Sequence, residues 1–206
     1  MNNRSPKQFP SRRSVDAAAW HRRPGEVCEW LVVCGDLHHD LERAVAQLAD
    51  WDGLGVTRIV DVREEWSDEE LVASVAPHIA YHHLGTHDAG DRQPDKWWDA
   101  GLAVLAERRH GDRLLVHCHM GVNRGPSMAF RLLLADGWRV TEALDAIRAV
   151  RPIAAILYAD SALVHHVEST GMDSDRAGAA FEELGDWFRD KPIDVAGVIS
   201  RIRRAA

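Results

Sequence analysis

Residues 114–127, LLVHCHMGVNRGPS, decide the fold. Their apolar start, 114–116, predicts a buried strand that runs directly into His117 and Cys118. A helix from about Ser127 to Ala135 is expected next, because proline is favoured near a helix start and glycine just past its end. The stretch therefore predicts a strand, a turn that begins at Cys118, and a helix.

The rest of the chain repeats this alternation of strands and helices. Apolar runs predict further strands at 30–34, 58–62 and 79–84. Apolar residues at helical spacing predict helices at 41–51, 64–75, 94–109, 141–150 and 159–167. Because the strands are almost entirely apolar, the expected fold class is α/β, with a central, mostly parallel sheet flanked by helices.

Three parts are expected along the chain. Residues 1–25 form a basic N-terminal arm, residues 26–170 a catalytic domain, and residues 171–206 a helical C-terminal tail. The arm carries six arginines and lysines up to residue 23 against a single carboxylate, Asp16. It can be read as a solvated arm or as an electrostatic guide for an anionic substrate.

Composition excludes several classes of protein. With 206 residues, 46% of them hydrophobic and 28% charged, the chain has the composition of a globular domain without an apolar run of membrane-spanning length. A formal net charge of −7 argues against a general nucleic-acid binder. Three irregularly spaced cysteines make a poor disulfide framework and, with no export signal recognised, favour a cytoplasmic location.

The turn at Cys118 has the chemistry of an anion site. Backbone amides of a strand–turn–helix can converge on one centre, and the helix N-terminus adds partial positive charge there. Such surroundings favour a thiolate at Cys118, and Gly121 lets the backbone adopt conformations that other residues resist. Arg124 can give two parallel hydrogen bonds to phosphate. A nucleophile and an anion clamp are thus expected at one site.

This segment resembles the His-Cys-x5-Arg signature of the protein tyrosine phosphatase superfamily, and most closely its dual-specificity branch. The resemblance extends from about Trp30 to His166. It implies hydrolysis of phosphomonoesters, phosphoproteins first, through a phosphocysteine and without metal or cofactor. The catalytic residues that it implies are Cys118, Arg124 and Asp88. Phosphate binding falls to His119, Met120, Gly121, Val122, Asn123 and Arg124, with support from His117 and Ser127.

The resemblance also implies a general acid on a loop about thirty residues before the nucleophile. Asp88 lies at that distance, in a loop rich in turn-forming residues, and Asp91 is the alternative. His117 is expected to shape the catalytic loop by hydrogen bonding. His119 either touches substrate or only borders the loop.

One position departs from the family pattern. The signature arginine is usually followed by Ser or Thr, whose hydroxyl eases departure of the thiolate, but this chain has Gly125. Unless Ser127 replaces that hydroxyl, a slow second step is expected. The pair Asn123-Arg124 is also similar to the branch that removes phosphate from RNA 5′ ends. A non-protein substrate, such as an inositol phosphate or an RNA 5′ end, and a binding module with weak turnover therefore remain alternatives.

Paired histidines suggest a metal site that the sequence does not favour. They are His38-His39, His82-His83 with His87, and His165-His166. Adjacent side chains on a strand point to opposite faces, so the members of one pair do not readily bind one ion. No metal is therefore expected.

Overall fold

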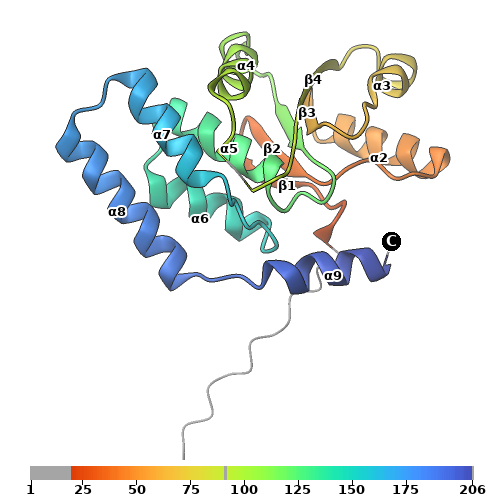
Figure 1. The fold of residues 1–206 in the computed structure, drawn as a ribbon. Coiled ribbons are helices and arrows are strands. Elements are labelled where there is room, and N and C mark those ends of the chain that lie inside the picture. The colour runs from red at the N-terminus through yellow and green to blue at the C-terminus, as the bar shows by residue number, and fades with distance from the viewer. Residues whose placement is uncertain (1–19, 91, 206) are drawn as a thin grey trace, which may run out of the picture.

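The computed structural model describes residues 20–90 and 92–205, and its centre is a five-stranded sheet with strand order β1-β2-β5-β3-β4 (Figure 1). β1 runs antiparallel to β2, and every other neighbouring pair is parallel. The strands are β1 (Gly25–Cys28), β2 (Leu31–Cys34), β3 (Arg58–Arg63), β4 (Ala80–Thr86) and β5 (Leu114–His117). The expected α/β class with a mostly parallel sheet is confirmed.

Helices cover both faces of the sheet (Figure 1). One face carries α2 (Leu41–Gly53) and α3 (Glu69–Val75). The other face carries α4 (Asp95–Ala106), α5 (Arg124–Ala135), α6 (Val140–Val150) and α7 (Ala159–Thr170). α8 (Ser174–Asp190) packs on α6 and α7, and α9 (Val195–Ala205) follows it along the lower edge of Figure 1.

The strand side chains alternate between two apolar cores. In β5, Leu114 and Val116 join the larger core under α5, whereas Leu115 joins the smaller core with Leu48 and Trp51 of α2. This period of two is a property of any strand, and here both faces are apolar because both are covered. Two buried layers hold β5 in place.

The position of β5 in the sheet determines where the catalytic loop lies. β5 lies between β2 and β3 and is parallel to both, with Leu114 level with Leu31 and Arg58. The carboxyl ends of three strands therefore meet where the chain leaves His117. In open α/β sheets, ligand sites form at that edge.

The structure differs from the sequence-based expectations in a few elements. β1 was not expected, and α5 begins at Arg124 rather than at about Ser127, because the Ser127 amide already donates to the carbonyl of Asn123 at 2.8 Å. Pro126 thereby falls in the first turn, where its missing N–H costs no helical hydrogen bond. Most of the predicted basic arm, residues 1–19, lies outside the described residues, as do residues 91 and 206.

No helix in the described ranges has both the length and the apolar character that crossing a membrane requires.

Candidate active site

A cleft of about 500 Å³ opens over the phosphate loop, residues 118–124. The loop leaves β5 at Cys118, whose side chain is buried at the bottom of the cleft, and ends where α5 begins. The walls come from the phosphate loop, from the loop after β4, from the loop before α7, and from helix α9. The lining residues are Glu65, Asp88, Ala89, Gly90, Cys118, His119, Met120, Val122, Asn123, Arg124, Leu157, Val195, Ile199 and Arg203.

Arg151, just after α6, holds the outer side of the phosphate loop. Its fully buried guanidinium donates to the carbonyls of Met120, at 3.0 Å, and Gly121, at 2.5 Å. Further bonds of 2.9 Å go to the carbonyls of His21 and Arg23 in the segment before β1. Because these loop carbonyls face Arg151, the opposite edges of their peptide groups, which carry the N–H donors, are directed away from it. This arrangement suits an amide-lined anion site.

Gly121 is required by this contact. Its φ is +62°, in the left-handed region that L side chains rarely adopt. A Cβ atom at this position would lie 2.0 Å from Nη2 of Arg151. Backbone strain and collision therefore both exclude a side chain, and the glycine lets the buried arginine approach the loop.

The guanidinium of Arg124 has two donors left for a ligand. Arginine carries five N–H groups. Nη1 donates to Glu65 at 2.8 Å and to the carbonyl of Thr86 at 2.9 Å, and Nη2 donates to Glu65 at 2.7 Å. Nε is buried and has no hydrogen-bond partner among the described residues. The Nε–H and the second N–H of Nη2 lie on one edge, the side-on pair that matches two phosphate oxygens.

Glu65, in the loop after β3, holds this arginine in place. Burial acts against the charge of Arg124. The hydrogen bonds that Arg124 donates to Glu65 and the charges of Cys118, Glu65 and Asp88 outweigh this effect and raise the pKa of Arg124. Partial burial likewise acts against the charge of Glu65, yet Arg124 lowers the pKa of that carboxyl. The pair is therefore ionised at neutral pH.

Asp88 lies beside Arg124 and is fixed by two donors. Its Oδ1 accepts 2.7 Å hydrogen bonds from Nδ2 of Asn123 and from the hydroxyl of Tyr158, while Oδ2 lies 3.5 Å from Nε of Arg124. Burial is the main cause that raises the pKa of Tyr158, and the bond to Asp88 adds to it, so the phenol stays a donor. The structure thus brings one expected acid to the cleft, whereas the alternative, Asp91, lies outside the described residues.

His119 is tied to the body of the protein. Its Nδ1 lies 2.8 Å from Oδ2 of the fully buried Asp36, whose Oδ1 lies 3.1 Å from both His21 and Arg22. Burial opposes the charge of Asp36, but these partners lower its pKa. The His119 ring also packs edge-on against Trp66, with 5.2 Å between the ring centroids, and it borders the cleft. His119 therefore both anchors the loop and lines the site.

His117 differs from its expected hydrogen-bonding role. The ring is fully buried against Trp51, and neither of its nitrogens has a hydrogen-bond partner among the described residues. Its Nε2 lies 3.8 Å from Oδ1 of Asp61, and burial lowers the pKa of the imidazole. Asp61, Asp68 and His117 stand close enough to hold an ion, but Arg63 donates to both carboxylates and already balances their charge.

Gly125 and Ser127 occupy different sides of α5. A Cβ atom at Gly125 would lie 3.5 Å from Sγ of Cys118 and 3.2 Å from its backbone nitrogen. The buried Ser127 hydroxyl instead lies 3.4 Å from Oδ1 of Asn123 and accepts from the amide of Tyr158 at 3.2 Å. Ser127 thus supports the residues around Asp88, and the position facing the sulfur has no hydroxyl.

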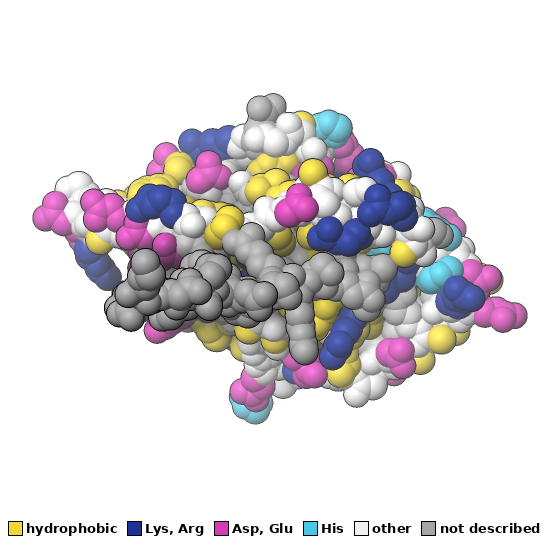
Figure 2. Space-filling model, turned by 90° about the horizontal axis from the view of Figure 1, so that it is seen from below, with side chains coloured by type: hydrophobic (Ala, Val, Ile, Leu, Met, Phe, Trp, Pro, Cys, Tyr) yellow, Lys and Arg dark blue, Asp and Glu magenta, His cyan; other side chains and the backbone are white. Residues whose placement is uncertain are grey.

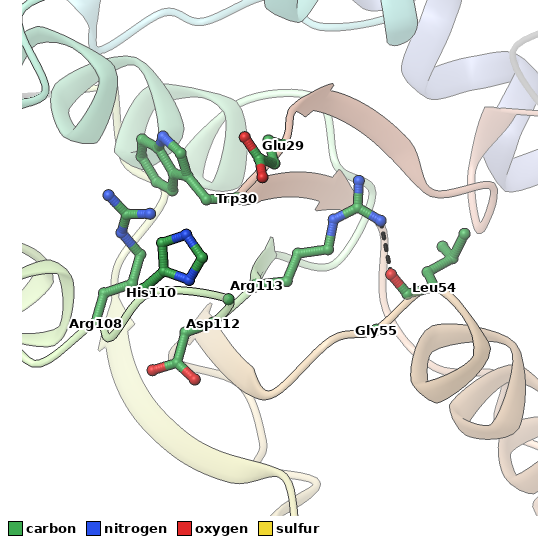
Figure 3. Close-up of a pocket in the computed structure, with 9 residues that line it drawn as sticks. Glu29, Trp30, Leu54, Gly55, Arg108, His110, Asp112 and Arg113 are labelled. Atoms are coloured by element: carbon green, nitrogen blue, oxygen red, sulfur yellow. Dashed lines mark hydrogen bonds between the residues drawn. The ribbon is translucent and has the colours of Figure 1, made fainter.

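A second hollow, of about 400 Å³, lies at the opposite end of β5 (Figure 3). Two of its arginines already have partners. Arg113 donates to the carbonyl of Leu54 and to Glu26, both at 2.6 Å, and Arg108 stacks on Trp30 with 4.7 Å to the ring centroid. These contacts are typical of a structural surface, so the cleft over Cys118 is the better candidate for chemistry.

Sequence reasoning missed several residues that build the site. Glu65 follows the carboxyl end of β3, a position where ligand sites form, so the strand prediction contained a usable signal. Arg151 was given no role in the predicted site. Tyr158 had no local signal because its partner Asp88 is 70 residues away. The contribution of α9 was not expected either.

Known proteins are similar to this chain in sequence over part of its length and in fold over most of it. No protein-family model matches the chain. A search of curated proteins finds human protein phosphatase Slingshot homolog 2, which is 25% identical over 111 residues, covering 52% of this chain and 7% of the relative. The match therefore spans a small part of that protein.

Solved structures share the fold. Human DUSP28 superposes with a TM-score of 0.57 at 18% identity, covering 71% of this chain and 95% of that one. PTPMT1 in complex with PI(5)P gives a TM-score of 0.57 at 20% identity, covering 74% and 97%. The human tyrosine phosphatase-like serine/threonine/tyrosine-interacting protein gives a TM-score of 0.57 at 13% identity, covering 72% of this chain and 99% of that one. The resemblance to the dual-specificity branch of the protein tyrosine phosphatase superfamily is confirmed.

Proposed function

We propose that this chain, which has the fold and signature loop of dual-specificity phosphatases, hydrolyses phosphomonoesters through a phosphocysteine. One observation carries the proposal. Cys118, the free edge of Arg124 and the carboxyl of Asp88 converge on one cleft. A nucleophile, an anion clamp and a proton donor are the groups that this displacement requires.

In the first step, Sγ of Cys118 attacks the phosphorus as the thiolate. A P–S bond forms while the ester P–O bond breaks, and Asp88 gives its proton to the departing oxygen. Nε and Nη2 of Arg124, together with the loop amides, hold the phosphoryl oxygens. Arg124 is already oriented by Glu65 and Thr86, so little reorganisation is needed when the substrate binds.

In the second step, water attacks the phosphorus of the phosphocysteine. The Asp88 carboxylate takes a proton from this water, the P–S bond breaks, and inorganic phosphate and the thiolate are released. Gly125 offers no hydroxyl to the departing sulfur, and Ser127 contacts Asn123 and Tyr158 instead. The second step is therefore expected to be the slow one.

Phosphorylated Tyr, Ser or Thr side chains of proteins are the first substrate class that the resemblance implies. A non-protein phosphomonoester is the second, and the likeness to a structure solved with PI(5)P supports it. The alternative to a phosphatase is a phosphate-binding module with weak turnover, and the absence of a hydroxyl at Gly125 is the reason to consider it. The three free cysteines suit the reducing cytoplasm, where Cys118 would stay a thiol.

Hydrolysis of p-nitrophenyl phosphate tests the proposal. We expect turnover that persists with a chelator, is lost in Cys118→Ser, and is retained in Cys28→Ser, a matched change in β1 away from the cleft. In Asp88→Asn the pH profile should flatten on the limb set by the general acid. Turnover that disappears with the chelator, or survives in Cys118→Ser, would refute the thiol mechanism.

A further inference from the structure

We propose that α9 is part of the substrate site and that Arg203 binds a second anionic group of the substrate. The substrate class is then a small phosphomonoester that carries another phosphate or a carboxylate. This inference rests on the proposed function and adds to it the chemistry of the substrate.

The phosphate loop itself supports α9. Val198 and Ile202, four residues apart and therefore on one face of the helix, are buried. They pack in one apolar cluster with Val122 of the loop and with Ile153 and Ala155 after α6. The amide of Ala155 donates to the carbonyl of Val122 at 2.6 Å, so the surface under the helix is bonded to the catalytic loop.

A second stripe of α9 borders the cleft. Val195, Ile199 and Arg203 follow one another at intervals of four residues, and all three line the cleft that holds Cys118. Since residues four apart lie one above the other on a helix, these side chains form a continuous strip. The strip is apolar at its first two positions and cationic at the third.

Arg203 is available to a ligand. Its side chain is exposed, and no carboxylate in the described part of the chain lies within ion-pair distance of it. Arg124 in the same cleft is different, because Glu65 engages two of its donors. An arginine next to apolar side chains can give two hydrogen bonds to a phosphate or carboxylate. Figure 2 shows the face on which α9 lies, with arginine and lysine side chains beside hydrophobic ones.

The size of the cleft favours a small substrate. A volume of about 500 Å³ falls in the range of small-molecule sites. Its walls combine two anion-binding arginines with apolar surface from Met120, Leu157 and the α9 strip. This combination suits a compact molecule with two anionic groups better than an extended phosphopeptide.

The test compares matched substrates. The ratio of kcat/KM for inositol 1,4-bisphosphate to that for inositol 1-phosphate measures use of a second phosphate. The ratio of kcat/KM for 4-carboxyphenyl phosphate to that for phenyl phosphate measures use of a carboxylate as the second anionic group. We expect Arg203→Ala to lower at least one ratio about tenfold, the size of one charge-assisted hydrogen bond, and Arg203→Lys to keep part of it.

Arg204→Ala is the matched control, because Arg204 is on the same helix, donates to Ser200 and does not line the cleft. It should keep both ratios. The inference would be overturned if both ratios were the same in the wild type and in Arg203→Ala. It would also be overturned if a phosphopeptide were hydrolysed faster than every small substrate and its rate did not change in Arg203→Ala. Calorimetric binding of the same substrate pairs to Cys118→Ser separates this inference from the proposed function. If the preference for the ligand with two anionic groups is lost when Arg203→Ala is added, the role of Arg203 is supported even without turnover. If that preference persists in the double variant, the role of Arg203 is refuted and the proposed function is not affected.

Discussion

Nδ2 of Asn123 donates a 2.7 Å hydrogen bond to Oδ1 of Asp88, so a phosphate-loop side chain positions the proposed general acid. The hydroxyl of Tyr158 binds the same oxygen from a third loop. Three loops that are far apart in sequence thus meet at one carboxyl group. Its orientation depends on the phosphate loop that binds the substrate.

Tyr158→Phe should impair the first step selectively. Loss of this donor leaves Asp88 less well oriented, and kcat/KM should fall about tenfold for alkyl phosphates, which need a protonated leaving group. The loss should be smaller for p-nitrophenyl phosphate, whose leaving group departs without help. In an Asp88→Asn background the same change should add nothing, and a full additional loss there would contradict the positioning role.

Gly125→Ser should accelerate the second step. A Cβ at this position lies 3.5 Å from Sγ of Cys118, so its hydroxyl can reach the departing sulfur. In the wild type we expect an initial burst of p-nitrophenol in stopped-flow traces, because the phosphocysteine persists. In Gly125→Ser the burst should disappear as kcat rises about tenfold.

Gly125→Ala is the control for that experiment. It adds the same Cβ, with the same close approach to the Cys118 backbone, but no hydroxyl. The burst should therefore remain. If Ala and Ser at this position behaved alike, the effect would come from packing and the hydroxyl argument would fail.

Gly121→Ala should disrupt the phosphate loop. The added Cβ meets Arg151 at 2.0 Å and forces strain at a φ of +62°, so we expect activity to fall by more than about a hundredfold. Gly137→Ala is the matched control, since Gly137 has a φ of +91° but nothing within 4 Å of a Cβ. It should cost about 1 kcal/mol of unfolding free energy and leave turnover intact. Similar activities in both variants would refute the requirement for close approach by Arg151.

Glu65→Gln should reveal a pH-dependent contribution to stability. Arg124 lowers the pKa of Glu65 below its ordinary value of 4.5, so the folded protein keeps this carboxylate ionised at a lower pH than the unfolded chain does. The resulting stability is fully present above the unfolded pKa and is lost as the pH falls through the folded pKa. Urea unfolding should therefore separate wild type from variant at pH 7, and the difference should shrink at pH values below about 4.5. A stability difference between wild type and variant that increased as the pH fell would contradict this prediction.

The sequence predicts the parts of the site that depend on local structure. The strand before Cys118, the turn and the helix after it follow from apolar runs, glycine and proline within residues 114–137. Glu65 and α9 could not be predicted in the same way. Glu65 is 59 residues from Arg124, and Val198 packs with Val122 through tertiary contacts that have no local sequence pattern. Asn123 was interpreted for its likeness to RNA phosphatases, and its bond to Asp88 became visible only when two loops were placed together.

Arg151 links the phosphate loop to the carbonyls of His21 and Arg23. A shortened version of the protein that began at β1 would keep every residue of the cleft. It would leave this buried cation with two acceptors fewer and remove the contacts of His21 and Arg22 with Asp36. Such a truncation would act as an active-site mutation made at a distance. Weak phosphatase activity in a trimmed preparation would then reflect the missing segment and would not contradict the activity proposed for the full chain.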